Sequence, residues 1–134
     1  GVGLNAVELG ANPVLTERVV QDLNRDPVLP WPNGCFDAAV VTVSVQYLTR
    51  PVEVFAEAGR VLRPGAPFVV AFSHRCFPSK AIAAWLERGP RGHAELVTEY
   101  FRLARAFASA RSFNISPGRG HDPMYVVMAQ KLAG

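Results

Sequence analysis

The side chains of this sequence that are best suited to chemistry stand where apolar runs end. Ser73, His74 and Arg75 follow directly on the apolar run Pro67–Phe72. An imidazole titrates close to physiological pH, so His74 could act as a general base, and Arg75 could contact a substrate beside it. Cys76 comes next, and an ordinary buried thiol is the simpler interpretation of that residue. We therefore expect one wall of a substrate pocket at the end of this run.

A second group of candidates stands at the end of the preceding apolar run. Val43, Ser44 and Val45 close that run, and Gln46 and Tyr47 follow. If both runs are strands of an open α/β sheet, ligands gather outside their carboxyl ends. We expect Gln46 and Tyr47 to bind substrate. The alternative is one exposed polar residue beside one half-buried aromatic ring.

Neither the histidines nor the cysteines are spaced like metal ligands. The chain has three histidines and two cysteines, and no companions stand at helical, hairpin or CxxC spacing. These residues are His74, His93, His121, Cys35 and Cys76. We therefore expect no metal, and we expect reduced thiols in a cytoplasmic protein.

Charge and hydropathy limit the classes of partner. The formal net charge of +3 comes mostly from arginines scattered along the chain, so nucleic-acid binding has little support. The longest apolar runs fall far short of the roughly 20 residues that a membrane helix needs. The first residues also lack the charged start of a signal peptide. We expect a soluble chain that binds neither nucleic acid nor membranes.

A strand, a helix and a second strand must position the candidate residues within a single domain, 1–134. The runs 36–43 and 67–72 are continuously apolar, as in parallel strands covered by helices on both faces. Between them a helix opens at Pro51 and stops at Arg63-Pro64-Gly65, a turn in which glycine accepts a positive φ. The apolar face of this helix carries Val54, Phe55, Ala58, Val61 and Leu62.

Short elements precede this unit and a hairpin follows it. Asn5 can cap a helix over Ala6–Ala11, and Thr16–Asp22 contains a brief strand. Near the other end, the runs Ala108–Ile115 and Met124–Lys131 are joined by a segment rich in glycine and proline. Because no helix lies between these runs, they must pair antiparallel, and the sheet is mixed.

Two helices are expected between the unit and the hairpin. Ser79 can cap the first, which is broken at Gly89-Pro90, and His93 stands at the start of the second. The first helix places Ile82, Trp85 and Leu86 on one face. The second has an apolar stripe of Leu96, Tyr100, Leu103 and Phe107, which we assign to core packing.

Two strings of the sequence carry a family resemblance. Residues 35–41 read Cys-Phe-Asp-Ala-Ala-Val-Val, and residues 60–65 read Arg-Val-Leu-Arg-Pro-Gly. Together they resemble the class I S-adenosylmethionine-dependent methyltransferases of the small-molecule, type 11-like group, over nearly the whole chain. Ala66-Pro67 departs from the family's glycine there, and Pro67 is tolerable only at the start or edge of a strand.

The resemblance implies an α/β, Rossmann-like sheet that is parallel except for its last strand. It also implies S-adenosylmethionine as the cofactor and a small molecule as the methyl acceptor. Asp22 and Leu23 match the acidic residue and its successor that meet the adenine amino group in the family, although Asp22 could instead only cap its loop. Val43, Ser44 and Val45 match the segment that lies against the methionine portion.

The family's glycine-rich first strand, Glu/Asp-x-Gly-x-Gly, has no counterpart in this sequence. Gly1 and Gly3 stand where the resemblance places the end of the second strand. Because the first strand is central in the family, we expect a gap between the strand of Val19 and the strand of Val40, or a different pairing. Three explanations remain open: a truncated chain, a homodimer in which another chain fills the gap, or a degenerate domain.

Two functions follow from the resemblance. The leading hypothesis is a methyltransferase, or a fragment of one, that acts by direct displacement. Many such transfers need only alignment of the reactants, so a dedicated base such as His74 is not required. The rival is a non-catalytic binding or assembly domain that keeps the fold without the cofactor. A dinucleotide-binding enzyme is disfavoured because the glycine fingerprint of that class is absent.

Overall fold

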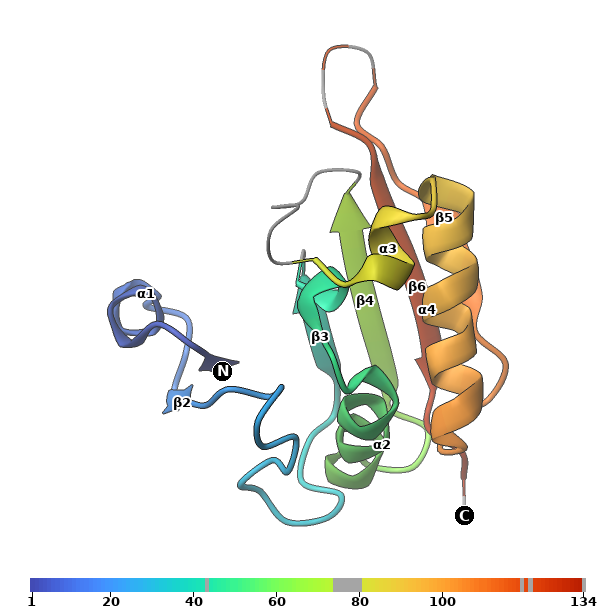
Figure 1. Ribbon diagram of the computed structural model, residues 1–134. Helices are drawn as coiled ribbons and strands as arrows, with labels where there is room; N and C mark the ends of the chain where they lie inside the picture. Colours follow the sequence, from blue (N-terminus) through green and yellow to red (C-terminus); the bar gives the residue numbers. More distant parts are fainter. Residues whose placement is uncertain (43, 74–80, 119, 121, 134) are drawn as a thin grey trace.

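The computed structural model of the chain describes residues 1–42, 44–73, 81–118, 120 and 122–133 (Figure 1). Its strands are β1 Val2–Gly3, β2 Val19–Val20, β3 Ala39–Thr42, β4 Pro67–Ser73, β5 Arg111–Asn114 and β6 Met124–Gln130. Its helices are α1 Ala6–Ala11, α2 Pro51–Val61, α3 Ala83–Leu86 and α4 Pro90–Ala104, and the 3-10 helix η1 covers Val45–Tyr47. The expected α/β class is confirmed.

The strands form two separate sheets. β1 and β2 pair parallel in one, and the other has the order β3-β4-β6-β5. Within the larger sheet β3 runs parallel to β4, whereas β6 runs antiparallel to β4 and β5. The larger sheet is therefore parallel except for its last strand, as expected. The expected gap is also present, because β1 and β2 pair with no strand of the larger sheet in the described part of the chain.

Strand β4 is central in the larger sheet. Phe68, Val70 and Phe72 alternate along it and are all buried. Pro67 has no N–H to donate and stands at the first position of the strand, as expected. Gly65 precedes it with a φ of +81°, a conformation that glycine adopts without strain. The sequence pattern therefore predicted both the strand and the turn that leads into it.

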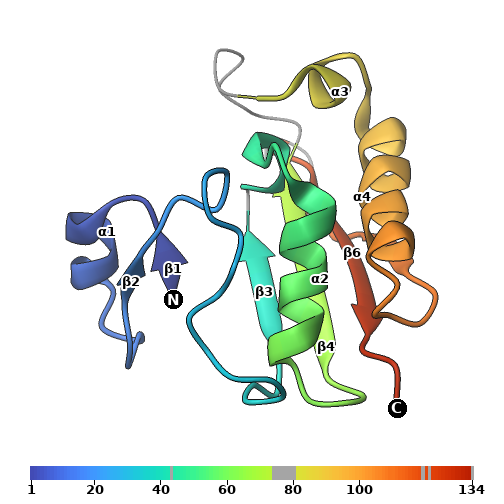
Figure 2. The ribbon, with the colours of Figure 1, turned by 60° about the horizontal axis from the view of Figure 1, so that its bottom comes forward.

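Helices α2 and α4 pack against each other on one face of the larger sheet (Figures 1 and 2). The ring of Phe55 in α2 lies 4.9 Å from the rings of both Phe68 in β4 and Phe101 in α4, measured between centroids. Phe68 and Phe101 are themselves 5.4 Å apart. Edge-to-face packing of this kind adds to the free energy gained from burying the rings. The expected apolar face of α2 is buried in this cluster.

Helix α4 buries a wider face than the sequence pattern predicted. Gly89-Pro90 separates α3 from α4 as predicted, and Pro90 also opens α4, because proline is favoured in the first helical turn. Leu96, Tyr100 and Phe107 of the predicted stripe pack in or against the core as assigned, although Phe107 lies beyond the end of the helix, whereas Leu103 is 46% exposed. The buried residues of α4 include His93, Val97, Tyr100 and Phe101. The predicted stripe included Tyr100 but missed Val97 and Phe101, and an apolar pattern could not include His93.

Helix α3 is shorter than expected. It has four residues, with Ile82 at its N-cap and no side-chain capping bond. Ser79, the predicted cap, lies outside the described residues. Trp85 is buried as predicted, whereas Leu86 on the same predicted face is 48% exposed. One turn of helix therefore inserts a single indole into the core.

Strands β1 and β2 and helix α1 form a small unit with little core of its own. Asn5 caps α1 as predicted, because its Oδ1 accepts from the N–H groups of Val7 and Glu8 at 2.9 and 3.2 Å. No residue of α1 is buried. In both ribbon views β1 lies on the side of the unit that is nearer to β3 (Figures 1 and 2).

The second face of the larger sheet carries apolar residues that none of the described helices covers. The register places Val40, Val69 and Val126 on this face, together with Phe113 at the edge. Val40 is 64% exposed and Phe113 is 45% exposed. Helices α2 and α4 lie together on the other side (Figure 2). The apolar pattern of both strand faces was read correctly from the sequence, but only one face has a helical cover here.

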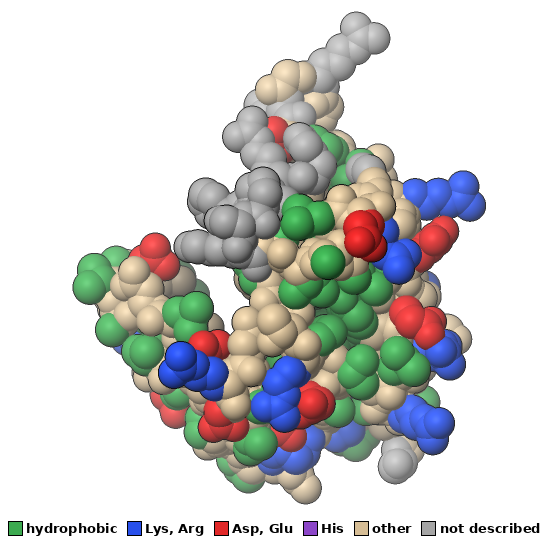
Figure 3. Space-filling model, in the orientation of Figure 1, with side chains coloured by type: hydrophobic (Ala, Val, Ile, Leu, Met, Phe, Trp, Pro, Cys, Tyr) green, Lys and Arg blue, Asp and Glu red, His purple; other side chains and the backbone are tan. Residues whose placement is uncertain are grey.

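Charged side chains of both signs are interspersed over the helical face (Figure 3). Ion pairs within α4, such as Glu99 with Arg102, contribute to this pattern. Among the helices described, none is long and apolar enough to cross a membrane.

Candidate functional site

The segments that follow β2 and β3 lie against each other. The first is the turn from Asp22 to Asp26, and the second is Ser44 with η1. The side chain of Asn24, in the first segment, hydrogen-bonds to the main chain of Tyr47, the last residue of η1, and of Thr49. The structure therefore brings together two groups of candidate residues that are distant in the sequence.

Asp22 begins a tight turn. Its Oδ1 accepts from the N–H of Asn24 at 3.0 Å, and its carbonyl accepts from the N–H groups of Arg25 and Asp26 at 3.1 and 2.9 Å. The loop-capping interpretation of Asp22 is therefore confirmed. Its Oδ2 lies 3.7 Å from the Nε of Arg25, and 41% of the side chain is exposed. That exposed oxygen can still accept a hydrogen bond from a ligand, so capping and binding are compatible.

Asn24 is a residue of the site that the sequence pattern did not reveal. Its Nδ2 donates to the carbonyl of Tyr47 at 3.0 Å, and its Oδ1 accepts from the N–H of Thr49 at 2.9 Å. The spacing of Asp22 and Asn24 is typical of a turn in which an aspartate side chain bonds two residues ahead. That local signal could have placed the turn. Nothing local indicates partners 23 and 25 residues further along the chain.

Helix η1 forms a buried corner at the end of β3. Val45 is fully buried and Gln46 is 1% exposed, whereas Tyr47 is half-buried and Ser44 is exposed. The alternative of an exposed polar residue at position 46 is therefore wrong. The carbonyl of Gln46 accepts from the N–H of Ile82 at 3.1 Å. Contact between the Gln46 side chain and a substrate requires its neighbours to move, while Ser44 and Tyr47 are accessible.

Three of the predicted site residues, Val43, His74 and Arg75, lie outside the described residues. Ser73, the last residue of β4, is 8% exposed and pairs with Met124 in the β4–β6 ladder. Since β3 and β4 are parallel neighbours, Ser73 at the end of β4 lies at the same edge of the sheet as Ser44.

A buried imidazole joins α3 to α4. The ring of His93 stacks on the ring of Trp85, with centroids 3.8 Å apart and 8° between the planes. Its Nε2 lies 2.8 Å from the carbonyl oxygen of Trp85. Burial lowers the pKa of His93, and the hydrogen bond to that carbonyl opposes the effect. Because only 6% of the residue is exposed, we assign His93 to packing, as a neutral ring that holds α3 on α4.

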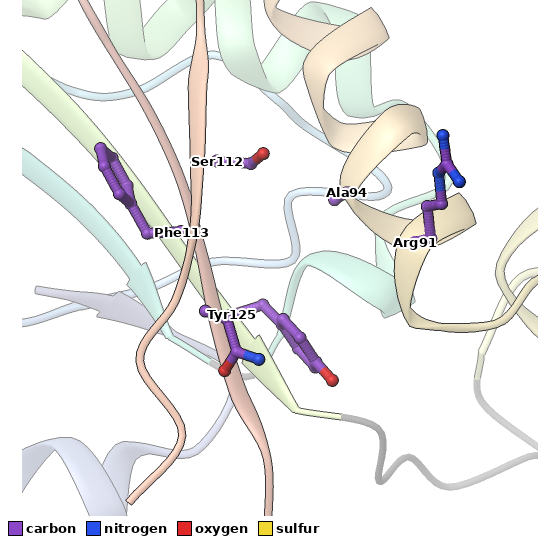
Figure 4. A pocket seen from close by; sticks show the side chains of 6 residues that line it. Arg91, Ala94, Ser112, Phe113 and Tyr125 are labelled. Carbon is purple, nitrogen blue, oxygen red and sulfur yellow. The ribbon is translucent and has the colours of Figure 1, made fainter.

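A hollow of about 370 Å³ opens between α4 and β5 (Figure 4). Its lining comprises Arg91, Ala94, Ser112, Phe113, Asn114 and Tyr125. Figure 4 shows Ser112 directed toward Ala94 and Phe113 directed to the opposite side of β5. The lining thus comes from both faces of an edge strand, and none of the predicted site residues belongs to it. We assign this hollow to the sheet edge rather than to the site.

The part of the chain that the structure describes contains no cluster of metal ligands. No group of three or more His, Cys, Asp or Glu side chains there could hold a metal ion. Cys35 is a free thiol. The described residues of the site offer carboxylate, hydroxyl and main-chain groups at the carboxyl edge of the strands.

One family model matches the chain. It is that of the methyltransferase domain, and it matches residues 5–70, a stretch that contains both segments of the site. None of the curated proteins matches the chain.

Solved structures share the fold of the whole chain. The (4+2)-cyclase SpnF is 19% identical with a TM-score of 0.68, and the match covers 100% of this chain and 66% of the cyclase. A SAM-dependent methyltransferase from Methanosarcina mazei is 16% identical with a TM-score of 0.59, and the match covers 100% of this chain and 82% of that one. Another, from Mesorhizobium loti, is 18% identical with a TM-score of 0.63, over 98% of this chain and 79% of that one. These similarities confirm the fold that the sequence resemblance implied.

Proposed function

Residues 5–70 belong to the methyltransferase-domain family and the chain has the class I S-adenosylmethionine-dependent methyltransferase fold, so we propose that it takes part in methyl transfer to a small molecule. The observation that carries this proposal is the contact between the turn after β2 and the segment after β3. It links the turn that contains Asp22 and Leu23 to the segment that contains Ser44 and Val45. Ligands of open α/β sheets bind at this edge.

The groups at this edge fit the adenosine part of the cofactor. The exposed carboxylate oxygen of Asp22 can accept from an exocyclic amine. Among the described residues, the N–H of Leu23 donates to no acceptor, so it can donate to a ring nitrogen. One acceptor and one donor on consecutive residues match the paired donor and acceptor on the edge of adenine. Ser44 and Val45, with Val43, are the proposed wall for the methionine portion.

S-adenosylmethionine, when bound, supplies an electrophilic methyl group that an oxygen, nitrogen or carbon nucleophile can attack in line. The contribution of this chain is to hold the reactants in that alignment and to exclude water from them. Tyr47 and Arg75 are the proposed substrate contacts, and Gln46, which is 1% exposed, joins them only when its neighbours move. His74 is the proposed acceptor of the proton that the nucleophile loses.

Assembly and location belong to the same proposal. The chain spans 66% of the length of the cyclase, and the family's glycine-rich segment is not among its 134 residues. We propose a homodimer in which a second copy contributes a strand between β1 and β3. Light scattering during size-exclusion chromatography would measure the mass, and a strict monomer would contradict the dimer. We also propose a cytoplasmic location, because the two cysteines stand far apart in the sequence and reduced thiols are the default for such a chain.

Calorimetric titration with S-adenosylhomocysteine tests cofactor binding. Saturable heat at one site is expected. Absence of heat at ligand concentrations on the order of millimolar would overturn the proposal and favour the non-catalytic alternative.

Two neighbouring aspartates, Asp22 and Asp26, provide a test variant and its matched control. Asp22→Asn keeps the turn's acceptor but removes the charge, so we expect about tenfold weaker binding. Asp26→Asn changes a neighbouring aspartate whose Oδ1 accepts from the N–H of Val28 at 3.1 Å, and it should bind as the wild type does. Equal affinities of the two variants would remove Asp22 from the site.

A further inference from the structure

The side-chain amide of Asn24 bonds to the main chain on both sides of Leu48. It donates to the carbonyl of Tyr47 at 3.0 Å and accepts from the N–H of Thr49 at 2.9 Å. Asn24 donates one of these bonds and accepts the other, as facing residues of two antiparallel strands do. A carboxamide held at both ends cannot rotate without breaking one of them. Asn24 therefore fixes orientation as well as distance.

The turn that carries Asn24 is itself tied internally. The main-chain N–H of Asn24 donates to Oδ1 of Asp22 at 3.0 Å, and Asp26 donates to the carbonyl of Asp22 at 2.9 Å. Asp22 and Leu23 therefore keep their place relative to Asn24. Fixing the Asn24 side chain against Tyr47 and Thr49 fixes these two residues relative to η1.

No strand pairing in the described residues performs this task. β2 ends directly before the turn, but its sheet is separate from the sheet that contains β3. The guanidinium of Arg50 adds one longer bond, from Nη1 to the carbonyl of Arg25 at 3.3 Å. Asn24 makes the shorter pair of bonds; its bond to Tyr47 is partly buried, where a hydrogen bond competes less with water, and its bond from Thr49 is exposed.

We propose that Asn24 is a positioning residue of the cofactor site, which holds the adenine-side residues Asp22 and Leu23 in register with the methionine-side wall at Ser44 and Val45. This inference rests on the proposed function. Loss of the Asn24 bonds leaves both walls intact but lets them move apart. The affinity for a ligand that spans them then falls, while the core around α2 and α4 is unaffected.

Three variants of the whole chain test this role. Asn24→Ala removes both bonds. Asn24→Asp keeps the acceptor for Thr49 but faces the Tyr47 carbonyl with a second acceptor. Asn33→Ala is the matched control, because Asn33 lies in the same long loop and its side chain accepts only from Arg60, at 2.9 Å, among the described residues.

Affinity for S-adenosylhomocysteine is measured by calorimetry well below the unfolding temperature, where a modest loss of stability does not change the folded fraction. We expect both Asn24 variants to bind about tenfold more weakly than Asn33→Ala. Affinities equal to that of Asn33→Ala would overturn the inference while leaving the proposed function standing. Wild-type affinity in Asn24→Asp would show that the Tyr47 bond is not needed, which also overturns it.

Amide hydrogen exchange gives a readout that needs no ligand. In Asn24→Ala the N–H of Thr49 should exchange at least about fivefold faster than in Asn33→Ala, while amides of β4 remain protected. If the wild type binds no ligand, the proposed function fails and exchange alone decides whether Asn24 joins the two segments. Unchanged exchange at Thr49 would then refute the contact itself.

Discussion

Glu57 and Arg60 hold the long loop between β2 and β3 against helix α2. The carboxylate of Glu57 accepts from the N–H of Leu29 at 2.9 Å and from both Nε and Nη2 of Arg60 at 2.8 Å. Arg60 also donates to the carbonyl of Leu29 at 2.9 Å. Only 17% of the Glu57 side chain is exposed. These bonds connect the loop that precedes β3 to helix α2, which follows β3.

Glu57→Gln should lower the free energy of unfolding by about 1–3 kcal/mol, because it weakens charge-assisted bonds in a shielded position. Urea denaturation followed by circular dichroism measures this. Glu53→Gln is the control, since Glu53 also pairs with an arginine three residues away but is 55% exposed. Its effect should stay within about 0.5 kcal/mol. Similar losses in both variants would contradict the network's role.

The pair of Glu57 and Arg60 also makes the free energy of unfolding depend on pH. The hydrogen bond from Arg60 holds the pKa of Glu57 below its ordinary value of 4.5, against the opposing effect of burial. The unfolded chain therefore binds this proton more readily than the folded chain does. The stabilisation is complete above the ordinary value and is lost as the pH falls through the lowered one. Glu57→Gln should flatten this part of the curve, and an unchanged slope would count against the assignment.

Single residues also show which contacts can be predicted from the sequence and which cannot. Asp22 and Asn5 were predicted to cap, and both do, because capping depends on neighbours within three residues. Asn24 was missed because its partners come from another loop. Gln46 is buried because η1 turns it inward, and a polar residue after a strand gives no sign of that.

At the level of elements, Gly59 sets how closely α2 approaches the segment after α4. A Cβ added at position 59 would lie 2.7 Å from the Cβ of Ala106 and 3.4 Å from Cζ of Phe107. Gly59→Ala should therefore destabilise the fold by about 1–3 kcal/mol, although alanine is the better helix former. Thermal unfolding measures the change.

Gly10→Ala in α1 provides the opposite expectation. Nothing lies within 4 Å of the Cβ that this change would add, so the substitution should be neutral or stabilise by up to about 1 kcal/mol.

The double variant Gly59→Ala with Ala106→Gly should recover part of the stability that Gly59→Ala loses, because it removes the opposing methyl group. A stabilising effect of Gly59→Ala alone would show that the two segments are not so close in solution.

The elements most accurately predicted were those with the strongest patterns. The continuous apolar strands, the helix from Pro51 and the closing hairpin are all present. The end of each element follows from a local residue, such as the proline and glycine before β4. The burial of His93 in α4 could not be predicted, because it depends on a contact with Trp85 of another helix.

On the scale of the whole molecule, the two sheets should differ in local stability. The unit of β1, α1 and β2 has two-residue strands and no buried residue in its helix, whereas β4 and β6 each have seven residues and pair along their full length. We expect the N–H groups of Val19 and Gln21 to exchange well before those of β4 and β6, although they are bonded at 2.9 Å to Gly1 and Gly3. Nuclear magnetic resonance at constant pH measures both sets. Equal protection would mean that the chain opens as one cooperative unit.

The topology was predictable as far as the resemblance reached. The parallel order, the antiparallel last strand and the gap beside β3 all follow from it and are confirmed. How the turn after β2 meets η1 across that gap was not predictable, because it depends on single side chains rather than on the order of the strands.

The apolar second face of the larger sheet changes how one common assay should be interpreted. Dyes such as anilinonaphthalene sulfonate become fluorescent on exposed apolar surface, and their binding is usually taken as a sign that side-chain packing has been lost. With Val40 and Phe113 exposed on a folded sheet, this chain offers such a surface in its native state. Dye fluorescence would then accompany an intact near-ultraviolet circular dichroism spectrum. Only the second signal would report on whether the core is packed.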